Sequence, residues 1–114
     1  MTYKDVATMI STLGLPYAYN EFPDGTQQEP PFICFLYPSS SDFFADGTNY
    51  QRIRQLVIEL YTPDKNIILE EAVESCLLAH DLAFTRDEVY IGAERMFQIV
   101  YTTEIVITEE STNG

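Results

Sequence analysis

The stretch YQRIRQLVIELYT, residues 50–62, is the longest strand pattern in the chain. In its second half the side chains alternate between the two sides of an extended backbone. Leu56, Ile58 and Leu60 fall on one side, and Val57, Glu59 and Tyr61 fall on the other. The first half differs, because Arg52 and Arg54 share one side. We therefore expect the first half to extend beyond the core as one strand of a long hairpin.

Four further segments around this stretch have strand patterns. Residues 32–37, FICFLY, are apolar on both sides, which predicts a covered central strand that ends at Pro38. Tyr17 to Phe22 is strand-like, and the following residues 23–31 contain Asp24-Gly25 and three prolines, which indicate a loop. Ala83 to Ile91 and Arg95 to Thr108 are expected to form two strands joined at Gly92-Ala93-Glu94. In the last strand one side carries Phe97, Ile99, Tyr101, Ile105 and Ile107.

Two segments have helical patterns. The first spans about residues 3–13, with Thr2 as the N-cap, Asp5 at the third helical position and Gly14 at the stop. The second follows the cap Asn66 and has one apolar stripe. The stripe consists of Leu69, Ala72, Val73, Cys76, Leu77 and His80. The side predicted to face solvent consists of Glu70, Glu71, Glu74 and Asp81.

The predicted fold class is therefore α+β, a two-layer sandwich of order αβββαββ. Two helices are expected to cover one face of a mostly antiparallel sheet. Residues 1–108 form a single domain in this interpretation, and residues 109–114 form a disordered tail. The residues expected in the core are Leu69, Val73, Leu77, Phe97 and Ile99. Apolar side chains on the other face, such as Val57 and Tyr61, predict that a partner covers it.

Composition excludes several classes of protein. Eighteen acidic residues against six basic ones give a net charge of −12, which repels nucleic-acid phosphates and leaves no cluster of cations to bind them. No stretch is apolar over the ~18 residues that a membrane span needs, and the first residues do not resemble a signal peptide, so we expect synthesis and retention in a cytoplasm. Cys34 and Cys76 lie in apolar patterns without CxxC spacing, which favours buried reduced thiols over a disulfide or a metal site.

The residue types of known catalytic and metal sites do not occur at suitable spacings. His80, the only histidine, falls on an apolar stripe near a helix end, where packing explains it better than catalysis. Asp42, Asp46 and Asn49 lack the ligand count of a calcium loop. The sequence therefore predicts no enzyme activity, no cofactor and no metal.

The segment SDFFADGTNY, residues 41–50, joins two of the strand patterns and contains the adjacent pair Phe43-Phe44. A solvated loop has no local reason to hold this pair between Asp42 and Asp46. Two interpretations remain open. The phenylalanines either anchor the loop on the core or contact another protein.

The element order, with this loop and the strand patterns around it, resembles the small tail proteins of prophages in low-GC Gram-positive bacteria. The similarity is to the tail-completion or tail-terminator type, over roughly residues 1–107. The resemblance implies a hexameric ring at the head-proximal end of the tail, in contact with the tail tube protein and with head–tail connector proteins. It also implies location in the virion after expression in the host cytoplasm.

In such proteins, loops or hairpins reach the next subunit or the tail tube. Applied to this chain, the resemblance makes residues 39–54 that extension, hereafter the arm, with Phe43 and Phe44 as its anchors. The residues expected at the subunit or partner interface are Phe43, Phe44, Asp46, Tyr50, Arg52 and Arg54. Two alternatives from other classes are an acidic DNA mimic that inhibits a nucleic-acid-binding protein, and a small hydrolase or ligand-binding protein. The scattered acids, interrupted by basic residues, weigh against the mimic.

The charge gives a first testable prediction. The chain should show no measurable affinity for DNA at physiological salt, because its net charge repels phosphate and no basic face exists. A filter-binding or fluorescence titration across several salt concentrations measures this. Salt-sensitive binding tighter than about 10⁻⁶ M would contradict the prediction, since it exceeds ordinary non-specific binding.

Overall fold

The computed structural model describes residues 1–22, 28–45 and 49–108, and of residues 43–45, 49 and 50 it describes the backbone. The elements in chain order are α1 (Tyr3–Ser11), β1 (Tyr17–Tyr19), β2 (Phe32–Leu36), β3 (Phe43–Ala45), β4 (Asn49–Thr62), α2 (Ile67–Ala79), β5 (Phe84–Ile91) and β6 (Met96–Ile107). The predicted order αβββαββ is confirmed, and the short strand β3 is added to it. Asp46 and the tail 109–114 lie outside the described residues.

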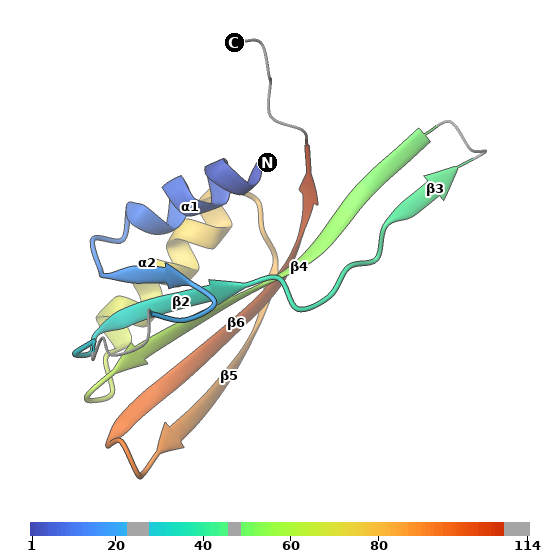
Figure 1. Ribbon diagram of the computed structural model, residues 1–114. Helices are drawn as coiled ribbons and strands as arrows, with labels where there is room; N and C mark the ends of the chain where they lie inside the picture. Colours follow the sequence, from blue (N-terminus) through green and yellow to red (C-terminus); the bar gives the residue numbers. More distant parts are fainter. Residues whose placement is uncertain (23–27, 46–48, 109–114) are drawn as a thin grey trace.

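All strands belong to one sheet, and both helices lie on the same face of it (Figure 1). The strand order is β1-β2-β4-β6-β5, and β3 pairs with the first residues of β4. The longest ladder joins β4 to β6, from Arg52 opposite Ile107 to Thr62 opposite Phe97. The predicted α+β sandwich with a mostly antiparallel sheet is therefore observed. The exception is β1, which pairs in parallel with β2.

The core lies between the helices and one face of the sheet. The alternation predicted for residues 56–61 is confirmed, because Leu56, Ile58 and Leu60 are buried. Their neighbours in the core include Ile99 and Tyr101 of β6. From the helices the core receives Val6, Met9, Ile10, Val73 and Leu77. Of the other residues predicted in the core, Leu69 and Phe97 are partly buried and pack against this cluster.

Helix α1 begins where the sequence predicts. The Thr2 hydroxyl accepts a hydrogen bond from the Asp5 amide at 3.0 Å, and the Asp5 carboxylate accepts one from the Thr2 amide at 2.9 Å. These two bonds form a capping box, which satisfies amides that the first turn leaves unpaired. The chain then turns at Gly14, whose φ of 74° is in the left-handed region that glycine adopts without steric cost.

Helix α2 begins after the predicted cap Asn66, but it is rotated relative to the predicted stripe. Glu70 was expected to face solvent and is instead 4% exposed, while His80 is exposed at the C-cap. The reason is a pair of cations, Lys65 and Arg86, that contact the Glu70 carboxylate. With that charge compensated, the helix can bury Glu70 and leave Ile68 81% exposed.

The adjacent residues Leu77 and Leu78 test this orientation of α2. Leu77 is 1% exposed and Leu78 is 60% exposed. We expect Leu77→Ala to lower the free energy of unfolding by about 2–5 kcal/mol, the usual cost of a cavity in a core. The matched control Leu78→Ala should change it by less than ~1 kcal/mol. Urea denaturation measures both, and equal effects would contradict the observed orientation.

Candidate functional site

The arm predicted at residues 39–54 is a hairpin that continues out of the sheet (Figure 1). Its base is held by backbone hydrogen bonds from the Gln55 amide to the Ser39 carbonyl at 2.9 Å and from the Ser41 amide to the Ile53 carbonyl at 3.0 Å. Further out, Phe43 pairs with Gln51 and Phe44 pairs with Tyr50. The arm is therefore an extension of β4 with regular pairing, and it presents the backbone of Phe43 and Phe44 away from the core.

The part of the arm that projects is shorter than predicted. Arg52 and Arg54 pair with Ile107 and Ile105 of β6, so they still belong to the main sheet. Only residues 43–45 and 49–51, among those described, lie beyond the last pair of the β4–β6 ladder. The arm thus has a base inside the fold and a short end outside it.

Both arginines of the arm contact side chains of their own chain. Arg54 forms an ion pair with Asp42, which also accepts a hydrogen bond from the Ile53 amide at 3.1 Å. The pKa of Arg54 is raised, mainly by hydrogen bonding to the Tyr3 side chain and to a smaller extent by Asp42. The guanidinium carbon of Arg52 lies 6.0 Å from the centre of the Tyr3 ring, within the range of a cation–π contact. These contacts fix the base of the arm against the start of α1.

An aromatic hollow of about 680 Å³ lies beside the base of the arm. Its lining consists of Tyr3, Tyr19, Phe35, Tyr37, Pro38, Ser39, Ser40 and Arg54. Among the described residues, the buried hydroxyl of Tyr37 has no hydrogen-bond partner. Burial, followed by the neighbouring Tyr3 and Tyr19, raises the pKa of Tyr37. The hollow is apolar enough to accept a side chain of a partner, and it lies next to the arm.

The sheet face opposite the helices carries a mixture of apolar and acidic side chains. Val89 and Val106 are exposed on it, and Glu59 lies between Cys34 of β2 and Val100 of β6. A second hollow, of about 940 Å³, opens at one end of this face. It is lined by Asn20, Glu21, Phe22, Gln28, Glu29, Pro30, Phe32, Cys34, Tyr61, Ile91, Ala93, Glu94 and Met96. We call it the sheet-face hollow.

On the helix face a network of charges joins α2 to β5. Lys65 donates to Glu70 at 2.9 Å and also pairs with Glu88. Arg86 pairs with Glu70 and donates to Glu88 at 3.0 Å. The hydroxyl of Tyr101 donates to Glu74 at 2.9 Å. Because Lys65 and Arg86 compensate its charge, the network explains the buried Glu70 as a structural feature rather than a reactive one.

The described residues contain no cluster of His, Cys, Asp or Glu that could hold a metal ion. In the part of the chain that the structure describes, no helix is long and apolar enough to cross a membrane. Cys34 and Cys76 are both free thiols, as the sequence predicted, although Cys76 is only partly buried.

No protein-family model matches the chain, and no curated protein matches it. A solved structure does. The chain is similar to a chain of the structure described as the virion of native gene transfer agent (GTA) particle, with a TM-score of 0.55 and 15% identity. The similarity covers 91% of this chain and 88% of that one. The two proteins therefore share a fold over nearly their whole length.

The predicted interface residues are brought together only in part. Arg52 and Arg54 lie on the same face at the base of the arm, the backbones of Phe43, Phe44 and Tyr50 lie beyond them, and Asp46 is outside the described residues. The sequence reasoning missed both hollows and the charge network. A signal for the network was available in Arg86 and Glu88, two opposite charges that share one side of a strand with the apolar Phe84 and Tyr90.

The charge network gives a prediction about pH. Hydrogen bonding to Lys65 is the main reason that the pKa of Glu88 lies below its ordinary value of 4.5. Its contribution to stability is therefore fully present above pH 4.5 and is lost as the pH falls through the lower folded-state pKa. In Glu88→Gln, the fall of the unfolding free energy below pH 4.5 should be less steep than in the native protein.

Glu71→Gln is the matched control, because Glu71 is exposed on α2 and forms none of the ion pairs found among the described residues. It removes the same charge without touching the network. Denaturant titrations at several pH values measure the slope for the three proteins. An equal flattening in both variants would show that net charge, and not the contact with Lys65, is responsible.

Proposed function

We propose that this chain is a structural protein of a phage or prophage virion, of the tail-terminator or tail-completion type. It would act by assembly rather than by catalysis, in a ring at the head-proximal end of the tail that joins tail to head. The observation that carries the proposal is the fold shared with a chain of a GTA virion over 91% of this chain. A virion component accounts for the conspicuous surfaces of this chain without requiring an active site.

The arm supports a ring-forming role. A closed ring uses a heterologous interface, in which one patch of a subunit meets a different patch of the next subunit. The arm is such a patch, because it projects at one end of the sheet, opposite the end at which β5 and β6 are joined (Figure 1). Its regular pairing with β4 gives it a defined direction, which a closed ring requires.

The interface in this proposal consists of Phe43, Phe44 and Tyr50 at the outer end of the arm, Arg52 and Arg54 at its base, and Asp46, which lies outside the described residues. Adjacent phenylalanines provide a large apolar anchor, the type of residue that dominates binding energy at interfaces. Arg54 pairs with Asp42 and Arg52 lies over Tyr3, so within the free chain the arginines stabilise the arm. Their contribution to the interface is then mainly to position the phenylalanines, with the tail tube and connector proteins as the further partners.

The double substitution Phe43→Ser, Phe44→Ser tests this role. We expect it to leave the melting temperature nearly unchanged, because β3 pairs only with the outer end of β4. It should abolish ring formation, which analytical ultracentrifugation and electron microscopy measure. It should also abolish the joining of tails to heads, which a complementation assay measures. Loss of folding would instead assign the two phenylalanines to the core.

The chain offers a matched control in Ile67→Ser, Ile68→Ser. These are a second pair of adjacent apolar residues, and they are exposed at the start of α2, away from the arm. This control should assemble normally. If both double variants assemble equally well, the arm is not the interface.

A further inference from the structure

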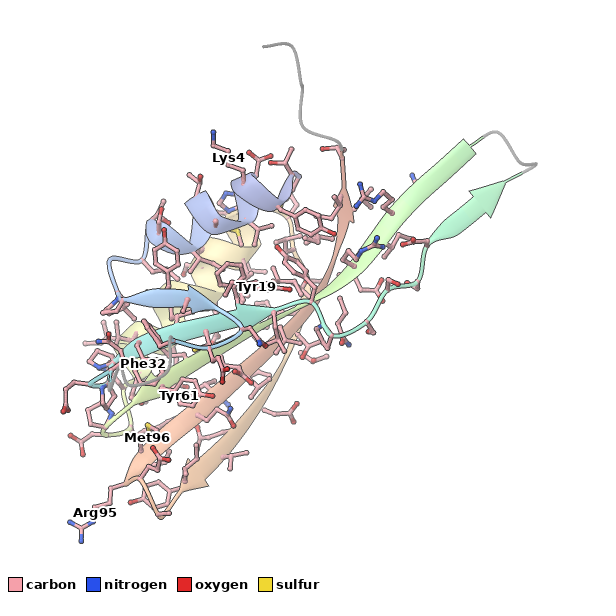
Figure 2. All side chains as sticks on the ribbon, in the orientation of Figure 1. Lys4, Tyr19, Phe32, Tyr61, Arg95 and Met96 are labelled. Carbon is pink, nitrogen blue, oxygen red and sulfur yellow. The ribbon has the colours of Figure 1, made fainter. Side chains whose placement is uncertain are left out.

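The sheet-face hollow combines an aromatic floor with an acidic rim. The rings of Phe32 and Tyr61 are stacked, with centroids 4.7 Å apart and planes 21° from parallel. The ring of Phe22 meets Phe32 edge-on at 5.4 Å. Figure 2 shows Phe32, Tyr61 and Met96 near one another on β2, β4 and β6. The floor is therefore a continuous patch of polarisable apolar groups across three strands.

The rim of the hollow carries only one sign of charge. Glu21, Glu29 and Glu94 are exposed among the lining residues, and no Lys, Arg or His is found among the described residues that line it. Glu59, beside Tyr61 on β4, accepts a hydrogen bond from the Tyr61 hydroxyl at 3.2 Å. Carboxylates thus surround an aromatic floor without a cation to balance them.

The pKa values of two groups at the floor, the buried Cys34 and the partly buried Tyr61, are raised mainly by burial and further by the neighbouring carboxylates. Burial, followed by the charges of Glu59 and Glu21, raises the pKa of the Cys34 thiol to about 11. Burial, followed by Glu59, raises the pKa of Tyr61 to about 12. Burial disfavours a charge of either sign at the floor, and only the smaller contributions of Glu59 and Glu21 reflect a negative potential that favours a cation beside them.

The basic residues of the chain do not supply that charge. Lys65 and Arg86 are paired on the helix face, and Arg54 is paired at the base of the arm. Arg95, the nearest in the sequence, points away from the molecule at the tip of the β5–β6 hairpin (Figure 2). The other two, Lys4 on α1 and Arg52 over Tyr3, do not line the hollow either, so a complementary cation would come from another molecule.

We propose that the sheet-face hollow is a docking site for an arginine side chain on an exposed segment of a different, basic protein. A guanidinium can stack on the face of Tyr61 that is turned away from Phe32, while its N–H groups reach the carboxylates of the rim. An ammonium is more strongly hydrated and cannot stack in this way, so the floor favours arginine over lysine. The hollow is within the size range of sites that take a side chain with its flanking backbone.

The isolated, folded chain is sufficient for the test, so the outcome is separate from that of the assembly experiments above. The probe is a capped Gly-Arg-Arg-Gly peptide, titrated into ¹⁵N-labelled protein and followed by NMR. We expect saturable shifts of the amides of Cys34, Tyr61, Ala93 and Met96. The same peptide with citrulline in place of arginine keeps the shape without the charge, and it should bind at least about tenfold more weakly.

The rim is tested by Glu29→Gln, Glu94→Gln, which removes two exposed carboxylates of the hollow. We expect this variant to bind the arginine peptide about five- to tenfold more weakly, because it loses two solvent-exposed charge pairs with the peptide. The matched control is Glu71→Gln, Asp81→Asn on exposed positions at the ends of α2, which should bind as the native protein does.

Three outcomes would overturn the proposal. The first is a set of shifts spread over the whole acidic surface instead of the hollow. The second is an equal loss of affinity in the rim variant and the α2 control. The third is equal affinity for arginine, lysine and citrulline peptides.

Discussion

The ladder between β4 and β6 is the constraint on which the rest of the structure depends. Its inner side chains, Leu56, Ile58 and Leu60 on one strand and Ile99 and Tyr101 on the other, form the centre of the core. Both helices pack on that surface. The same β4 continues past the last paired residue of β6 to form the arm, so the direction of the arm is set by the core. Because most of β4 is paired inside the sheet and only its first residues project, the sheet fixes the direction in which the arm leaves the core.

The net charge of −12 is distributed unevenly, because several basic residues are paired within the fold, whereas among the described acidic residues only Glu70 is buried. Lys65 and Arg86 bind Glu70 and its neighbours between α2 and β5, and Arg54 binds Asp42 at the arm. Three of the six basic residues therefore form ion pairs within the chain. What remains on the open sheet face is acidic and apolar together, a combination that repels nucleic acid and favours a basic protein partner.

Period-two and helical patterns predicted the fold well because burial on one face is a local property of each element. Each of these features depends on residues that are close in sequence. Examples are the alternation of faces in β4 and β6, the capping box of α1 and the Asn66 cap of α2. The rotation of α2 could not be predicted in this way. It depends on Lys65 before the helix and Arg86 on β5, which together compensate a buried carboxylate. The stripe assigned by hydrophobicity places Glu70 outside and Ala72 and His80 inside, whereas in the structure Glu70 is buried and Ala72 and His80 are exposed.

Of the candidate surfaces, the arm could be predicted from the sequence and the two hollows could not. The arm could be predicted from the sequence because two strand patterns flank a segment with two adjacent phenylalanines, and the second pattern begins with two arginines on one side. The two hollows were not visible, because each forms from residues that lie far apart in sequence. The aromatic hollow joins Tyr3 of α1 to Arg54 of β4, and the sheet-face hollow joins Phe22 to Glu94.

The placement of these surfaces bears on how such a chain can assemble. The arm and the aromatic hollow lie at one end of the sheet, whereas the sheet-face hollow lies on the opposite face near the β5–β6 hairpin. A subunit with different surfaces at its two ends can bind a copy of itself through one and a different protein through the other. Because the two surfaces are separated by the sheet, binding at one surface does not require a change of shape at the other. That separation suits a ring that must close on itself and still attach to a neighbouring layer of an assembly.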